Sequence, residues 1–259
     1  MNNVLSNIMI SEELDTKKRL LDMADRSYRN NQYVFTDFLS MADMSVYFEC
    51  EREFSYAGVT VWNGDGEYER GMLRFGNPDA FGYEEVFPID VLMITPLQEK
   101  FAEKLSHRDY LGSLMNIGIE RDVLGDIIID NTKAYLFCES NMSDFIIESL
   151  TRVRHTSVMV KKVDEIPSIE SRQPKETTIQ IASERIDAIV SKVYKLSRGD
   201  SAELFTSRRV FLNGRLMENY SHQVKPDDVV SVRGFGRFVY KGCGSISKKG
   251  KINATVNTY

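Results

Sequence analysis

The chain has 259 residues, of which 42% are hydrophobic and 27% charged, a composition typical of a soluble globular protein with two or three domains. No stretch approaches the ~18 consecutive apolar residues of a membrane helix, and the first residues lack the features of a signal peptide. The three cysteines are isolated, which argues against a disulfide framework or a zinc site and favours a cytoplasmic protein.

The net charge of −5 hides a strong asymmetry along the chain. Residues 183–259 hold 14 Lys and Arg against 7 Asp and Glu, a net charge of +7, which leaves −12 on the first 182 residues. A basic module on an acidic body is typical of a protein with one localised phosphate-binding surface. The alternative is that these basic residues only solvate a small domain.

The first 78 residues are expected to form an α+β unit of helices followed by a hairpin. Ser11 suits the N-cap of the first helix, because two glutamates follow it in the first turn. Thr36 is expected to cap the second helix. The predicted helices cover residues 11–30 and 36–50, and the predicted strands cover residues 59–62 and 72–75.

Residues 79–164 follow a β-α-β-β-α-β order, which predicts a ferredoxin-like (RNA-recognition-like) middle domain. Tyr135 and Phe137 alternate on one middle strand, but the full aromatic stacking motif of an RNA-recognition module is missing. We interpret these rings as sheet residues, with RNA contact as the alternative. The predicted strands cover residues 86–94, 126–129, 134–138 and 157–163, and the helical regions cover residues 97–116 and 143–153.

Residues 165–178 contain prolines, serines and several charges without periodicity, which predicts a linker. The C-terminal domain, residues 179–259, is expected to reorient freely on this linker. It opens with a helix over residues 184–195, whose apolar residues recur at i, i+3, i+4 and i+7 from Ile186. Arg185 and Lys192 fall on a different face, so one side packs and another is positively charged.

A second helix is predicted from Arg198 to about Ser207. Ser197 suits its N-cap, and Asp200 three residues later completes a capping box. Arg198 then lies in the first turn, where the helix dipole disfavours a cation by roughly 0.3–1 kcal/mol. A phosphate at this helix end would offset that cost.

The next strand, residues 210–212, ends at Asn213-Gly214, the strongest short hairpin pattern that a sequence offers. Basic residues flank this hairpin. They are Arg208 and Arg209 before it, Arg215 after its turn, and Arg233 and Arg237 in the closing segment, residues 228–237.

These features together resemble a known domain. Arg185-Ile186-Asp187, Ser197-Arg198, Asn213-Gly214 and Asp228-x-Val-x-Val-Arg233-Gly234 resemble the small α+β RNA-binding domain named after small-ribosomal-subunit protein S-four. The domain order and the ending Arg233-Gly-Phe-Gly-Arg237 resemble the YlmH-like RNA-binding proteins of bacteria. One position departs from the pattern: Arg208 stands where the fold usually has a glycine in a left-handed turn.

The resemblance implies a non-enzymatic, ribosome-associated protein that binds ribosomal RNA or tRNA on the large subunit. It implies a role in rescue of stalled ribosomes or quality control, and a link to cell division. No cofactor, metal or membrane partner is expected, and the protein is expected to be a monomer. The expected RNA-binding residues are Arg185, Lys192, Ser197, Arg198, Arg208, Arg209, Asn213, Arg215, Arg233 and Arg237.

Two alternatives remain open from the sequence. Domains of this type also occur on RNA-modifying enzymes, but no nucleophile elbow, phosphate-binding loop or Rossmann fingerprint is present, so no catalytic residue is predicted. The second alternative is a protein-interaction scaffold. In this case the acidic body of residues 1–163 carries the function by binding protein partners, and RNA binding is accessory.

Overall fold

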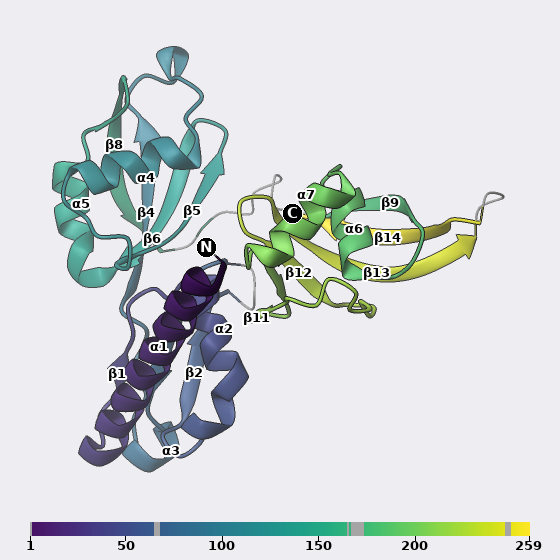
Figure 1. Ribbon diagram of the computed structural model, residues 1–259. Coiled ribbons are helices and arrows are strands. Elements are labelled where there is room, and N and C mark those ends of the chain that lie inside the picture. Colours follow the sequence, from purple (N-terminus) through teal and green to yellow (C-terminus); the bar gives the residue numbers. More distant parts are fainter. Residues whose placement is uncertain (1, 65–67, 165, 167–173, 247–249) are drawn as a thin grey trace. The chain divides into compact units, whose positions relative to one another are not determined.

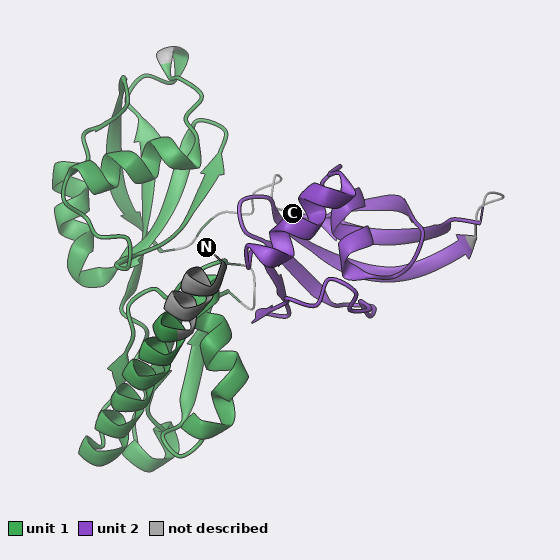
Figure 2. Ribbon diagram, in the orientation of Figure 1, with its two compact units in different colours: residues 1–169 green, residues 170–259 purple. Residues whose placement is uncertain are grey.

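The computed structural model describes residues 2–64, 68–164, 166, 174–246 and 250–259 (Figure 1). The chain divides into two compact units, residues 1–169 (unit 1) and residues 170–259 (unit 2), which Figure 2 shows in different colours. This division falls inside the segment expected to be a linker. Of that segment, only residue 166 and residues 174–178 are described.

The N-terminal part of unit 1 is a small antiparallel sheet in the order β1-β3-β2, with helices packed on it. Helix α1 buries Leu20 and Ala24 in one apolar core with Leu73 and Phe75 of β3, because these helix positions share a face. The elements are α1 (Asn2–Asn30), β1 (Val34–Phe35), α2 (Met41–Cys50), a 3-10 turn (Glu51–Phe54), β2 (Val59–Trp62), β3 (Met72–Phe75) and α3 (Pro78–Phe81).

The expected start of the second helix at Thr36 is wrong. Helix α2 begins after Ser40, whose hydroxyl accepts from the backbone N–H of Asp43 in a capping box. Thr36 instead follows edge strand β1, and its buried hydroxyl accepts from the backbone N–H of Leu73 at 3.0 Å. Ser40 and Thr36 are both good N-cap residues. Because β1 pairs with β3, Thr36 is held beside β3, and the helix begins after Ser40.

The second part of unit 1 is an antiparallel sheet in the order β5-β6-β4-β8-β7, with α4 and α5 between its strands in sequence. Leu92 and Ile94 of β4 are fully buried in the core that α4 and α5 share with the sheet. The elements are β4 (Ile89–Pro96), a 3-10 turn (Glu99–Phe101), α4 (His107–Asn116), β5 (Leu124–Asp130), β6 (Lys133–Glu139), a 3-10 turn (Ser140–Met142), α5 (Ser143–Ser149), β7 (Arg152–Val153) and β8 (Thr156–Val163).

Two helical predictions in this part are too long. The region expected over residues 97–116 contains a 3-10 turn and only then α4. The helix expected to reach Val153 ends at Ser149, and Arg152 and Val153 pair with β8 as a short edge strand. Ser143 does not cap this helix: its hydroxyl donates to Asp90, 2.7 Å away, and so ties α5 to β4.

The two parts of unit 1 share a core on the sheet face that lies opposite α4 and α5. Tyr135 and Phe137 of β6 are each 4% exposed, and they pack in one cluster with Trp62 and Tyr68 of the N-terminal hairpin. The Phe137 ring centroid lies 5.0 Å from that of Trp62 and 4.6 Å from that of Tyr68. The boundary expected at residue 78 therefore separates two sheets that belong to one compact unit.

Unit 2 is a sheet in the order β11-β10-β12-β13-β14-β9. Apolar residues of α6 and α7 share one core with the strands. Strand β9 starts at Lys175, so it extends into the segment expected to be a linker, and it pairs along its length with β14. The elements are β9 (Lys175–Ile181), α6 (Ile186–Val193), α7 (Arg198–Thr206), β10 (Val210–Leu212), β11 (Arg215–Leu216), β12 (Val229–Val232), β13 (Gly236–Ile246) and β14 (Ile252–Thr258).

The carboxyl of Glu139, at the end of β6, has a raised pKa. Loss of hydration, followed by repulsion from Asp37, raises its pKa from 4.5 to about 7, and Asp122 adds to the repulsion. The raised pKa means that the folded chain favours the neutral carboxyl. The stability contributed by this group is therefore fully present below about pH 4.5 and is lost as pH rises to about 7.

Replacing Glu139 by glutamine should remove this pH-dependent loss. We expect Glu139→Gln to raise the free energy of unfolding at about pH 8, above the shifted pKa, and to change it little at about pH 4. Urea unfolding at both pH values measures the difference, with Glu148→Gln, at an exposed position on α5, as the matched control. An equal effect at both pH values would contradict the shifted pKa.

Candidate nucleic-acid interface

Helix α6 presents cations at the surface because its other side is buried. Ile186, Ile189 and Val190 have no exposed surface and pack in the core of unit 2. This stripe recurs with the helical period, so Arg185 and Lys192, which lie off the stripe, remain solvent-accessible. The local pattern expected from the sequence thus positions two of the predicted site residues.

A hollow of about 540 Å³ lies beside these residues, where α6 meets the start of α7 and the end of β9. Its lining includes the cations of Arg185, Lys192 and Arg198 and the carboxylate of Asp187. We call this surface the cationic hollow. Positive charge exceeds negative charge in its lining, which suits a polyanion such as a nucleic-acid backbone.

Arg185 is held in one orientation by Asp187. Its Nε and Nη2 atoms donate to the two carboxylate oxygens at 3.0 and 2.9 Å, and this pairing raises the pKa of the guanidinium. The guanidinium also lies 5.5 Å from the ring centroid of Tyr220. Arg185 is therefore a preoriented cation that Asp187 partly neutralises.

Lys192 and Arg198 carry charges that no neighbouring carboxylate neutralises within the described ranges of the chain. Both side chains are exposed. Arg198 is also the first residue of α7, where the helix dipole disfavours a cation. A phosphate in the cationic hollow would supply the missing negative charge for both side chains.

Ser197 and Asp200 form the expected capping box at the start of α7. The Ser197 hydroxyl accepts from the Asp200 N–H at 3.1 Å, and the Asp200 carboxylate accepts from the Ser197 N–H at 3.3 Å. The Ser197 side chain thus serves the helix. The same turn places Arg198 at the rim of the hollow, so the contribution of Ser197 is positional.

Arg208 and Arg209, which follow α7, are engaged with the protein itself. Arg208 adopts the left-handed conformation, with φ +54°, and pairs with Glu218 at 3.2 Å. Arg209 Nε donates to the Arg233 carbonyl at 3.0 Å, and its guanidinium lies 5.5 Å from the Phe235 ring centroid. The guanidinium of Arg209 therefore stabilises the closing segment through its Nε and Nη2 donors.

The glycine after Arg233 is explained mainly by its backbone conformation. Gly234 has φ +84°, and a Cβ added there would lie 2.7 Å from Arg209 Nη2. Arg233 itself is exposed, while Arg237 lies 4.3 Å from the ring centroid of Tyr259. The arginine–glycine pattern of this segment is thus explained in part by backbone geometry.

Asn213 holds the hairpin expected between β10 and β11. Its φ is +50° and that of Gly214 is +78°, as a two-residue turn of this hand requires. Its amide nitrogen donates to Asp228 at 2.8 Å, and its amide oxygen accepts from the Val229 N–H at 2.9 Å. The side chain of Asn213 is therefore structural, and Arg215 follows it at an exposed position.

The structure therefore gathers Arg185, Lys192 and Arg198 in one place and leaves the other predicted residues outside the lining of the hollow. Sequence reasoning missed Tyr220 and Phe235, which are 52% and 41% exposed and lie against arginine side chains. Exposed aromatic rings beside cations suit stacking on unpaired bases. Phe235 stands inside the ending Arg233-Gly-Phe-Gly-Arg237, whereas Tyr220 belongs to no sequence pattern that would have marked it.

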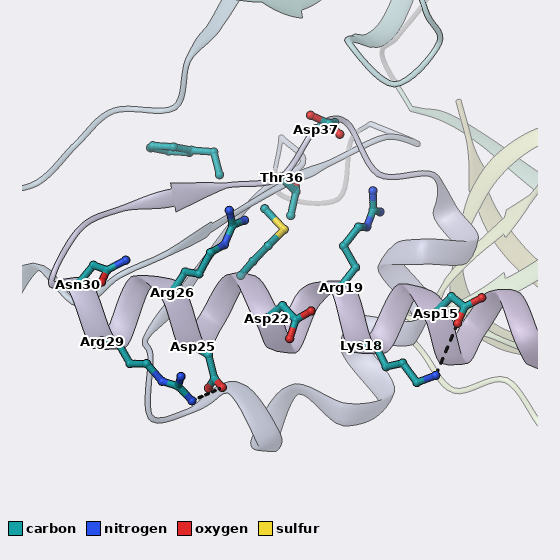
Figure 3. Close-up of a pocket in the computed structure, with 12 residues that line it drawn as sticks. Asp15, Lys18, Arg19, Asp22, Asp25, Arg26, Arg29, Asn30, Thr36 and Asp37 are labelled. Atoms are coloured by element: carbon teal, nitrogen blue, oxygen red, sulfur yellow. Dashed lines mark hydrogen bonds and ion pairs between the residues drawn. The ribbon is translucent and has the colours of Figure 1, made fainter.

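A different groove, of about 1050 Å³, runs along α1 beside β1 (Figure 3). Arg19 and Arg26 point from α1 toward Thr36 and Asp37, on the side of the groove away from the paired Asp25 and Arg29. The charges in its lining balance, so this groove lacks the excess of positive charge found in the cationic hollow. The charged lining residues are Asp15, Lys18, Arg19, Asp22, Asp25, Arg26, Arg29 and Asp37.

The described part of the chain contains no group of three or more His, Cys, Asp or Glu side chains arranged to hold a metal ion. Among the described helices, none is long and apolar enough to cross a membrane.

Comparison with known proteins places the middle of the chain in a family. Residues 83–166 match the family model described as "Putative RNA-binding domain in YlmH". The chain is also similar to "Ribosome-associated protein quality control protein P2" of Bacillus subtilis (strain 168), with 31% identity over 163 residues. That match covers 60% of this chain and 62% of the relative, so less than two thirds of the relative is matched.

Among solved structures, the chain is similar to "Cell division protein ylmH from Streptococcus pneumoniae". The identity is 19% and the TM-score is 0.43, over 62% of this chain and 92% of the other.

The matched domain is a putative RNA-binding domain, and the α+β fold and the cationic hollow are consistent with the class of RNA-binding proteins. Within this class, residues 83–166 form a domain of the kind described for YlmH, and over that part the chain is similar to the YlmH-like RNA-binding proteins.

The left-handed conformation of Arg208 yields a stability prediction. Arg208→Gly and Arg208→Ala both remove the pair with Glu218, but only glycine adopts φ +54° without steric cost. We expect the glycine variant to be about 1 kcal/mol more stable than the alanine variant. Urea unfolding of both variants measures the difference, and equal stabilities would show that this turn is not left-handed in solution.

Proposed function

We propose that this protein is a non-enzymatic, cytoplasmic RNA-binding protein that associates with the ribosome through the cationic hollow of unit 2. The observation that carries the proposal is the convergence of Arg185, Lys192 and Arg198 on one hollow. Phosphate contacts of this kind position a protein on RNA without reading bases. The hollow would therefore recognise the shape of a structured RNA more than its sequence.

Two further observations support this function. The net charge of +7 on residues 183–259, against −12 on the rest, concentrates the attraction for RNA on unit 2. The relative from Bacillus subtilis is named as a ribosome-associated quality control protein. We infer that the RNA is ribosomal RNA or tRNA on the large subunit, and that the protein acts there as a monomer when translation stalls.

A binding role is favoured over catalysis by how the polar groups around the hollow are used. Its carboxylate, Asp187, accepts from both Arg185 and the Ala188 N–H, so its oxygens are already engaged in hydrogen bonds. The hydroxyl of Ser201 donates to a backbone carbonyl. The cations that remain available suit phosphate binding.

The salt dependence of RNA binding tests this proposal. Lys192→Ala with Arg198→Ala should weaken binding of a labelled RNA hairpin to the full chain and lower the slope of log K against log salt by about 1.4–1.8. The reason is that two phosphate contacts are lost, each of which releases counterions. Fluorescence anisotropy over a series of salt concentrations measures the slope.

The matched control is Lys175→Ala with Lys225→Ala, which removes the same charge from exposed positions of unit 2 outside the lining of the hollow. The control should keep most of the affinity. Equal losses in both double variants would reduce the effect to net charge and overturn the hollow as the site. A wild-type chain that binds no RNA would overturn the function, and partners of the acidic unit 1 would then become the leading alternative.

A further inference from the structure

Unit 1 carries a cationic groove of its own, on the side of the middle sheet that faces α4. The groove has a volume of about 460 Å³ and lies between α4 and the β7–β8 hairpin. Arg108 reaches it from α4, and Arg152 and Arg154 reach it from the hairpin. Against these three cations its lining holds one carboxylate, Asp109. We call this surface the α4 groove.

The fold holds the cations of the α4 groove in place. Arg154 lies in the tight turn after β7 with φ +52°, and its guanidinium reaches Asp109 of α4 at 3.6 Å. Asp109 also accepts from the hydroxyl and the N–H of Ser106, at 2.6 and 2.8 Å, and these bonds lower its pKa. The carboxylate that Asp109 brings to the lining is thus already engaged within the fold.

The other two arginines are available for a ligand. Arg152 is exposed, and among the described residues it makes one long hydrogen bond, of 3.5 Å, to the His155 carbonyl. Arg108 is exposed and, among the described residues, has no ion-pair or hydrogen-bond partner. An excess of positive charge therefore faces the α4 groove from two elements that are 44 residues apart in sequence.

Gly112 lines the same groove, and the fold does not require a glycine at this position. It lies in the interior of α4, where glycine costs helix stability relative to alanine. A Cβ added there would meet no atom within 4 Å, so neither packing nor backbone conformation requires a glycine. A ligand that lies close to the helix backbone would require one.

The opposite face of the same sheet is closed to bases. RNA-recognition modules stack bases on aromatic residues of the sheet face. Here the aromatic residues of that face, Tyr135 and Phe137, are buried beneath Trp62 and Tyr68. RNA contact by residues 83–166 therefore needs another surface, and the α4 groove is the one whose charge fits.

We propose that the α4 groove is a second RNA-binding surface, in which Arg108, Arg152 and Arg154 bind the phosphate backbone and Gly112 admits it close to α4. Guanidinium groups suit this ligand because they donate to phosphate oxygens in pairs. The proposal rests on the proposed function in one respect, that RNA is the ligand, and it adds an independent site on the other unit.

Salt dependence in the full chain tests the groove. We expect Arg108→Ala with Arg152→Ala to lower the salt slope for a labelled RNA hairpin by about 1.4–1.8, because two phosphate contacts are lost. The matched control is Arg19→Ala with Arg26→Ala, which removes two exposed arginines of unit 1 from the charge-balanced groove along α1. The control should leave the slope unchanged.

Gly112→Ala provides a test that charge loss does not confound. We expect this variant to raise the urea midpoint of unit 1, because alanine favours the helix, and yet to weaken RNA binding. Cross-linking of thiouridine-substituted RNA to the wild-type chain should label peptides from residues 107–116 or 150–157. A variant that is stabilised and binds RNA as wild type does would overturn the role of Gly112 and the close approach of RNA.

The outcomes separate this proposal from the proposed function. If the Arg108/Arg152 variant keeps the wild-type slope while the Lys192/Arg198 variant loses it, the α4 groove is overturned and the cationic hollow stands. If the groove variant loses slope and the hollow variant does not, the α4 groove is supported and the hollow is overturned. A groove that binds an acidic protein, with the RNA slope unchanged, would also overturn the proposal.

Discussion

The cationic hollow depends on one hydrogen bond between helices α6 and α7. The Ser201 hydroxyl on α7 donates to the Asp187 carbonyl on α6 at 3.0 Å, and Ser201 is only 1% exposed. The carboxylate of the same aspartate accepts from Arg185 and from the Ala188 N–H. Asp187 thus fixes both the approach of α7 and the direction of a cation. A larger side chain in place of Ser201 would separate the helices and disperse the charges that the hollow brings together.

The basic residues of this chain divide by what their side chains already contact. Arg209 donates to a backbone carbonyl and packs on a ring, so its charge stabilises unit 2. Arg74, on β3, is buried and donates to Glu84. Arg198 and Arg108 differ, because each lies in the first turn of a helix whose N-cap is a serine, and has no acidic partner within the described chain. In both places the helix start favours an added anion, and neighbouring cations strengthen that preference.

Local patterns predicted much of unit 2, including the apolar stripe of α6, the capping box at Ser197 and the turn at Asn213. Each of these is decided by residues a few positions apart. The errors lie where distant pairing decides, as at Thr36, which the sheet recruits away from the expected helix. The structural use of Arg209 also escaped prediction, because it depends on a carbonyl 24 residues away. For the same reason no sequence pattern could have assembled the α4 groove.

We propose that the cationic hollow attaches this protein to the ribosome. Sedimentation with ribosomes, at low and high salt, tests it most directly for the wild-type chain, for Lys192→Ala with Arg198→Ala, and for the control pair Lys175→Ala with Lys225→Ala. We expect the wild type and the control to migrate with the large subunit at low salt, and the hollow variant to stay near the top of the gradient. Migration of the hollow variant with the large subunit, to the same extent as the wild type, would contradict the claim.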